Sequence, residues 1–484
     1  MWEGVSMRIV TNVVLFLSLG IHGCSGTSSS QTSDGGPDSG TVATASFERP
    51  ISLVFKVHLE PQSGSDAYKK RRDDVEAVHA LAKKYGLLLS IHGNGEFWQY
   101  ARELGDEAVV RGWLAEGYSI GPHMHSVYEE RDGEHSWRSA QPSQMTDATF
   151  VEELWKDHER ELKALLPDIT ITEATPYNCD DTTYATQMNQ HGYSASGGGR
   201  EEIAEPWIGH HPFHPWRIGA SNLEENLASP TVLVTHYAQF GEADKHGPNG
   251  TFADQSLAHH KVGFLLIYLN WLNAERSGDS NDKVWMYGFL THDTKSRTDV
   301  VASLEEWIKW LTENFGNGKK SVRGNTILKP STIRGVYDDY VAWEREHPNT
   351  SSFNVPTPTL SGDANSITSE QRKAIYPEAF WGLSELLRAD VDNVANYTRA
   401  VSDFASQGVS CHEIEYGSRA DSAKRAKRWL LWKESDGSAT VNLATVTGGA
   451  ELRYWNVRDK SSTNVSASAV TIGSEPVVVD LGSL

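Results

Sequence analysis

Two histidines stand two residues apart in the segment GYSIGPHMHS, at the end of the predicted strand 118–125. They are His123 and His125. Side chains at positions i and i+2 of a strand project to the same face, roughly 6.5–7 Å apart at ~3.3 Å per residue. Two imidazoles placed in this way can converge on one divalent ion, because zinc-type ions accept nitrogen ligands at ~2.0–2.1 Å. The spacing therefore predicts a metal site, with zinc as the expected ion.

A carboxylate near the first predicted strand can complete such a site. A catalytic zinc usually takes a third protein ligand and keeps one position for water. Glu60 lies beside Pro61, two residues after His58, where the apolar strand 51–59 ends. We therefore predict that Glu60, His123 and His125 are the metal ligands.

The other strand-end histidines point to the same place. His58 ends the strand 51–59, His92 the strand 87–93, His236 the segment 231–237, and His292 with Asp293 the segment 283–293. In an α/β barrel, the active site lies at the carboxyl ends of the strands. A single histidine there is more often a hydrogen-bonded loop residue. Six histidines at five predicted strand ends favour one catalytic centre.

The elements that must position these residues alternate along the chain. Apolar strands are followed by segments with helical spacing, at 68–85, 96–116, 147–166, 256–273 and 299–315. Repeated β–α units with apolar strands indicate a parallel sheet covered by helices. Seven or eight units within about 300 residues favour an α/β fold of the distorted (β/α)7–8 barrel type over an open sheet.

The amino-terminal segment predicts export. A basic start precedes an apolar run at 9–19, which has the length of a signal core and is too short to span a bilayer. Cys24 follows a small residue, as in bacterial lipoprotein signals, so residues 1–24 are predicted to be a signal peptide with Cys24 as the lipidation site. The Ser/Gly/Thr-rich residues 25–46 predict a flexible tether. We expect a bacterial, lipid-anchored protein of the cell envelope, on the periplasmic side or at the outer membrane.

The rest of the chain divides into three parts. Residues 47–348 hold the predicted barrel, and residues 349–426 a loop and helical region with helices expected at 369–387 and 391–406. Short alternating strands in 427–484 predict a small β-sandwich. The net charge of −20 argues against a nucleic-acid partner, because phosphate binding needs clustered Lys and Arg. Cys179 and Cys411 could form one disulfide or remain two separate thiols.

These motifs resemble the polysaccharide deacetylase superfamily over about residues 48–345. GYSIGPHMHS is similar to the segment that supplies metal-binding histidines in that family, in a His-x-His variant of its usual spacing. GFLTHD resembles the late strand that ends in the catalytic histidine, and KPSTIRGVYDDY the strand and helix that close the domain. The resemblance implies metal-dependent removal of N-acetyl groups from a carbohydrate. His292 would protonate the leaving amine, and Asp293 would orient or charge His292.

The sequence departs from the family at the general base. With Glu60 in the place of the metal-binding Asp, the base of the family falls at Leu59, which cannot take a proton. We therefore expect the base to have moved to His58 or His92. No arginine precedes the Pro-Tyr of EATPYNCDD, the segment similar to the third family motif. We expect substrate contacts from Tyr177 in that segment, from His236, and from Trp216 in WIGHHPFHPW, although an ordinary packed loop also fits the last segment.

Two other functions remain open. An amidohydrolase-type enzyme also uses His-x-His on a barrel strand, but on the first strand, whereas two strands precede the pair here. A catalytically degenerate carbohydrate-binding lipoprotein would explain Leu59 and the missing arginine. Turnover separates this binding protein from an enzyme better than metal content does.

Overall fold

The computed structural model describes residues 49–61, 64–131, 134–141, 144, 147–175, 184–197, 214–218, 226–234, 239–240, 254–255, 257–277, 283–292, 298–350, 380–387, 393–418, 420–449 and 451–483. The chain divides into two units, Met1–Ala45 and Ser46–Leu484. The first unit, with the predicted signal peptide and Cys24, lies outside the described residues. No helix in the described ranges is long and apolar enough to cross a membrane.

Strand β1 (Ile51–Leu59) lies in the middle of a parallel sheet, and all nine of its residues are buried. It pairs with β12 (Trp285–His292), β2 (Leu89–Gly93) and β13 (Leu328–Ser331), and β2 pairs in turn with β3 (Ser119–Pro122). Beyond β12 follow β10 (Gln239–Phe240) and β11 (Asp254–Gln255). The predicted parallel sheet is confirmed, because a strand buried on both faces reads as a nearly continuous apolar run.

The sheet continues past β3 through one bridge. His123 pairs in parallel with Thr175, which directly follows β6 (Glu173–Ala174). Three short strands extend from β6, in the order β7 (Ala195–Ser196), β9 (Val232–Leu233) and β8 (Trp216–Arg217). Among the described residues no pairing joins β11 to β8 or β9, so the described strands do not close into a barrel there.

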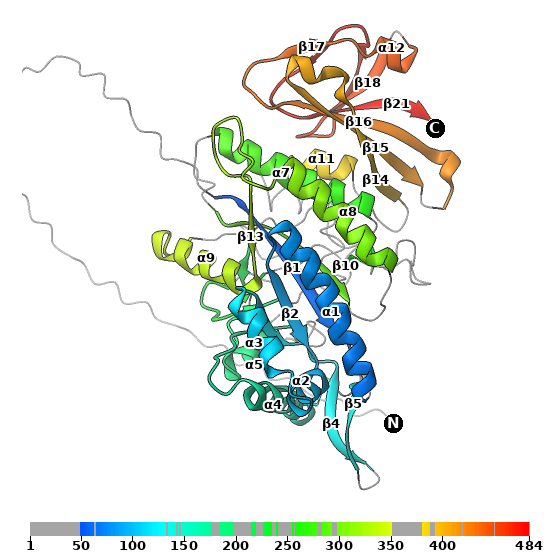
Figure 1. Cartoon of the computed structure of the whole chain (residues 1–484). Coiled ribbons are helices and arrows are strands. Elements are labelled where there is room, and N and C mark those ends of the chain that lie inside the picture. Colours follow the sequence, from blue (N-terminus) through cyan, green and yellow to red (C-terminus); the bar gives the residue numbers. More distant parts are fainter. Residues whose placement is uncertain are drawn as a thin grey trace, which may run out of the picture. The chain divides into compact units, whose positions relative to one another are not determined.

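Helices cover the sheet much as predicted (Figure 1). They are α1 (Ser65–Tyr85), α2 (Gly95–Glu103), α3 (Glu107–Ala115), α4 (Ala148–Leu165), α5 (Tyr184–Gln190), α7 (Leu257–Ser277), α8 (Thr298–Asn314) and α9 (Ile333–Glu346). The single helix predicted at 96–116 is two helices. The chain breaks at Gly105, whose φ of 79° lies in the left-handed region that glycine adopts without strain.

The carboxyl-terminal part is an antiparallel sheet. Its strands are, in spatial order, β14 (Asn393–Ala400), β15 (Val409–Ser418), β16 (Arg425–Lys433), β21 (Val477–Ser483), β18 (Glu451–Asn456) and β19 (Ser462–Ser466). The pair β17 (Ala439–Val441) and β20 (Val470–Ile472) also contributes to its apolar cluster. This cluster includes Cys411, a buried free thiol, whereas Cys179 lies outside the described residues.

The helix predicted at 391–406 is wrong. Strand β14 occupies this segment and pairs with β15 from Asn393 to Ala400. Pairing with a long neighbour and burial of Val394, Ala395 and Tyr397 outweigh the local helical spacing. The antiparallel sheet therefore begins inside the segment that the sequence assigned to a loop and helical region.

Outside the sheet, the contacts of His191 lead to a prediction about stability. His191, after α5, stacks on Trp155 at 5.0 Å between ring centroids, and its nitrogens lie 2.9 Å from Glu159 and 3.0 Å from Glu152. Burial lowers the pKa of His191, but the hydrogen bonds to these carboxylates outweigh it and raise the pKa overall. A raised pKa contributes stability that is present below the unfolded value and is lost as pH rises through the folded value.

We therefore expect His191→Gln to lower the free energy of unfolding by ~1 kcal/mol at about pH 5.5, where the imidazole of His191 is protonated. The difference should shrink towards zero at about pH 9, because neutral imidazole makes no ion pair. Urea unfolding of both proteins at the two pH values checks this. A difference independent of pH would mean that His191 acts by packing on Trp155 alone.

Candidate metal centre at the strand ends

The sheet places three histidines at one level. In the pairing register, His58 on β1 lies opposite His92 on β2 and opposite His292 on β12. Parallel neighbours end at the same edge, so the three backbones meet at the carboxyl end of the sheet. His123 follows β3 directly and adds a fourth histidine to this edge. The side chain of His292 lies outside the described part of the structure.

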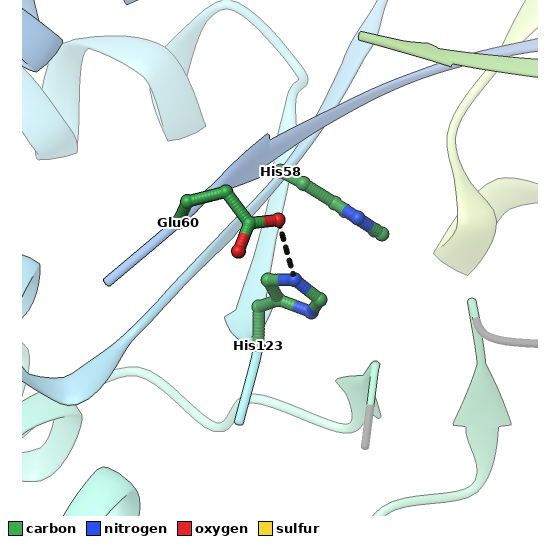
Figure 2. Close-up of side chains that lie close together, drawn as sticks. All are labelled: His58, Glu60 and His123. Carbon is green, nitrogen blue, oxygen red and sulfur yellow. Dashed lines mark hydrogen bonds and ion pairs between the residues drawn. The ribbon is translucent and has the colours of Figure 1, made fainter. Parts of the chain in front are cut away.

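Three side chains converge at this edge (Figure 2). One ligand atom from each of His58, Glu60 and His123 lies within 4.8 Å of the other two. His123 Nε2 is 3.3 Å from Glu60 Oε1, and the rings of His58 and His123 stack with their centroids 4.0 Å apart. His58 is 5% exposed and His123 3% exposed, whereas Glu60 is half-buried. Two buried imidazoles thus share one small volume with a carboxylate.

This geometry fits a zinc-type ion. Two ligands of a tetrahedral zinc, each at ~2.0–2.1 Å, lie about 3.3–3.4 Å apart. The His123–Glu60 separation of 3.3 Å already matches this spacing. Two histidines and one carboxylate are also a ligand set of catalytic zinc sites, which leave a further position for water.

His125 lies beside this cluster. Strand β3 ends at Pro122, so His125 belongs to the turn beyond it, with its ring centroid 4.3 Å from that of His123. In the part of the chain that the structure describes, His58 joins Glu60 and His123 in the convergent set, where the sequence had suggested His125. The same i, i+2 spacing relates His58, near the end of β1, to Glu60, the first residue after it, so this signal was available in the sequence.

His92 belongs to a polar network inside the sheet. It is fully buried, with Nδ1 2.6 Å from Thr175 Oγ1 and Nε2 2.8 Å from Glu173 Oε1. Ser119 Oγ also donates to this Glu173 oxygen, at 2.7 Å. Lys56, buried and donating to Gly197 O, lies on the same face two residues before His58. Both ring nitrogens of His92 are occupied, so its position does not support the predicted role as base.

The charge states in this network follow from burial. Desolvation lowers the pKa of His92, and the positive charge of Lys56 lowers it further. Desolvation also raises the pKa of Glu173 to about 7, against the hydrogen bond from Ser119. Burial therefore favours the neutral form of His92 and makes the protonated form of Glu173 accessible near neutral pH, which suits a structural hydrogen bond between them.

Removal of His92 should therefore cost stability and leave the metal site in place. We expect His92→Ala to lower the free energy of unfolding by about 3 kcal/mol, because it opens a cavity and leaves buried Glu173 short of a partner. Urea unfolding and zinc titration of the folded variant check this. The control is His79→Ala, which removes a half-buried, hydrogen-bonded histidine of α1 away from the strand ends. A variant with normal stability and normal zinc binding that has lost turnover would restore His92 as the base.

Leu59 points away from the metal centre. It is 0% exposed and belongs to the main apolar cluster, on the face of β1 opposite to His58 and Glu60. A Cβ atom built on Gly93 would lie 3.2 Å from Leu59 Cδ1, which places Leu59 against the neighbouring strand on that face. The residue that stands where the family has its base is therefore part of the core.

The remaining predicted site residues divide into two groups. Cys24, Tyr177, His236 and Asp293 lie outside the described residues. Trp216 is on β8 and is 2% exposed, so it offers no face to a substrate in this structure. Its position does not support a substrate contact, and its place among buried strands favours the packed-loop alternative.

Comparisons with known proteins gave structural likenesses alone. No protein-family model matches the sequence, and no curated protein matches it. A putative polysaccharide deacetylase from Mycobacterium smegmatis is 11% identical, over 61% of this chain and 92% of that chain, with a TM-score of 0.38. A probable polysaccharide deacetylase from Pseudomonas aeruginosa PAO1 is 14% identical, over 63% and 94% of the two chains, with a TM-score of 0.38. Puue allantoinase is 12% identical, over 65% and 96%, with a TM-score of 0.37. Likenesses of this size carry no argument about activity.

Proposed function

We propose that this protein is a metal-dependent hydrolase of the polysaccharide deacetylase type. The observation that carries the proposal is the convergence of His58, Glu60 and His123 at the carboxyl end of a parallel sheet. Burial of two imidazoles beside a carboxylate is costly unless the groups are paired or bind a cation. The motifs of the sequence that resemble the deacetylase family supply the reaction type.

His58, Glu60 and His123 would hold the ion. Such an ion would supply Lewis-acid chemistry, because it would polarise an acyl carbonyl and make water a better nucleophile. His125 is half-buried and lies beside His123. We propose its imidazole as the base for the attacking water. His292 ends the strand next to His58, and we propose that it protonates the leaving amine, with Asp293 as its partner.

The substrate that we propose is the N-acetyl group, or a related acyl group, of an amino sugar in an extracytoplasmic glycan. This rests on the family resemblance and on the signal-like segment 1–24 with Cys24 as lipid anchor. Tyr177 and His236 are proposed to contact the sugar. The buried position of Leu59 favours one alternative, a carbohydrate-binding protein on a degenerate deacetylase fold, because the residue at the position of the family's base is apolar and part of the core.

Metal content and acetate release test the proposal together. Full-length protein, the double variant His58→Ala/His123→Ala and the control His79→Ala are dialysed against zinc and assayed on a panel of N-acetylated oligosaccharides. We expect about one ion per chain and acetate release from the parent and the control, and neither from the double variant. Zinc binding without turnover would favour the carbohydrate-binding protein. Absence of zinc from the parent would overturn the metal centre.

A further inference from the structure

We infer that Asn94 is a positioning residue that joins the two ligand-bearing segments of the metal centre. Asn94 follows β2 and directly precedes α2. It is fully buried and carries no charge of its own. This inference rests on the proposed metal site and assigns a residue that the family motifs above do not include.

The side chain of Asn94 bonds to both segments. Its Nδ2 donates to Leu59 O at 2.7 Å, and Leu59 lies between His58 and Glu60 in the chain. Its Oδ1 accepts from the backbone N–H of His125 at 2.8 Å and from Ser126 Oγ at 3.0 Å. One buried amide therefore fixes the end of β1 to the turn that carries His123 and His125.

The side chain of Asn94 does not cap helix α2. Asparagine is among the preferred residues at a helix N-cap, where its side-chain oxygen normally accepts from the N–H groups of the first turn. Asn94 occupies the N-cap of α2 and makes no side-chain cap hydrogen bond. Its amide is directed to Leu59, His125 and Ser126 instead, so its side chain serves the strand ends rather than the helix.

The Asn94 side chain bonds to the backbone of Leu59 and of His125, so it can influence the positions of the neighbouring ligands through the backbone. Groups that orient metal ligands typically change metal affinity about 10–100-fold when they are removed. Asn94→Ala leaves all three proposed ligands in place and removes the side-chain hydrogen bonds between the end of β1 and the turn that carries His125. The backbone hydrogen bonds from Asn94 N–H to Leu59 O and from His123 N–H to Gly93 O remain. Asn94→Asp keeps an acceptor for His125 and Ser126 and replaces the donor to Leu59 O by an oxygen.

Asn270 is a matched control. It is a buried asparagine on α7 that also joins two backbone groups, donating to Leu266 O at 2.7 Å and accepting from the Phe380 N–H at 2.8 Å. Asn270→Ala should therefore cause a similar loss of stability without touching the strand ends. A general effect of losing a buried amide appears in both variants, and a positioning effect appears only at Asn94.

The experiment measures zinc affinity by competition with a chelating dye, and the visible spectrum of the cobalt-substituted full-length protein, for the parent and the variants Asn94→Ala, Asn94→Asp and Asn270→Ala. We expect both Asn94 variants to bind zinc about 10–100-fold more weakly with an altered cobalt spectrum, and Asn270→Ala to match the parent. If Asn94→Ala does not fold, Asn94→Asp decides by the same criterion.

Two results would overturn the inference in distinguishable ways. Equal zinc affinity and an unchanged cobalt spectrum in the Asn94 variants, with a parent that binds zinc, would show that Asn94 only stabilises the fold. A parent that binds neither ion would remove the proposed metal centre itself, and the positioning role with it.

Discussion

Replacing His58 by alanine is expected to remove zinc, whereas replacing His125 is expected to leave zinc bound and to lower turnover. His58 belongs to the convergent set with Glu60 and His123, and His125 lies beside it at the rim. We expect the zinc Kd to rise at least about 100-fold in His58→Ala, since loss of a ligand should exceed the loss of a supporting hydrogen bond. Loss of a general base should lower kcat about 100-fold or more in His125→Ala.

Zinc titration and acetate release on both variants, with His79→Ala as the control, separate the two roles. The reverse result would exchange the two roles. If His125→Ala loses zinc while His58→Ala keeps it, then His125 is the ligand that the His-x-His spacing first suggested. The base would then lie at His58, one of the two positions that the sequence analysis gave for it.

The second large effect concerns Leu59, at the position where the family has its base. Comparison of motifs alone would suggest that Leu59→Asp restores activity. The structure predicts the opposite, because Leu59 is fully buried in the apolar cluster on the far face of β1. An aspartate there would lose the packing of leucine and bury an unpaired polar group, so we expect the free energy of unfolding to fall by about 4–5 kcal/mol.

Urea unfolding of Leu59→Asp measures this loss, and Leu59→Met is the matched control. A hydrophobic change of similar volume should cost less than about 1.5 kcal/mol. A Leu59→Asp protein as stable as the parent and faster in acetate release would show that this side chain reaches the metal centre after all.

The sequence predicted the sheet more reliably than the identity of the ligands. Apolar runs such as ISLVFKVHL are typical of buried parallel strands, and β1 occupies the predicted residues 51–59. The edge at which Glu60 and His123 meet followed from the rule that parallel strands end together. The spacing argument was applied to His123 and His125, yet β3 ends at Pro122, before either of them.

The hydrogen-bond network around His92 could not be predicted from the sequence. His92 carries the same strand-end signature as His58, and their backbones are register partners. In the folded chain, the segment beside β3 brings Glu173 and Thr175 to His92, and their side chains occupy its ring nitrogens. Likewise, Asn94 reads as an ordinary helix cap until its long-range bonds to Leu59 and His125 are known.

The pairing of β1 also limits how the length of this chain can change during evolution. Since side chains alternate between the two faces, deletion of one residue within β1 would move His58 and Glu60 to the face that now holds Leu59, and Leu59 to the face of the metal centre. Every paired position from Ile51 to His58 is subject to this rule. Insertions and deletions can accumulate in the connecting loops, whereas within β1 only changes of two residues keep both histidine and glutamate on the side where they meet.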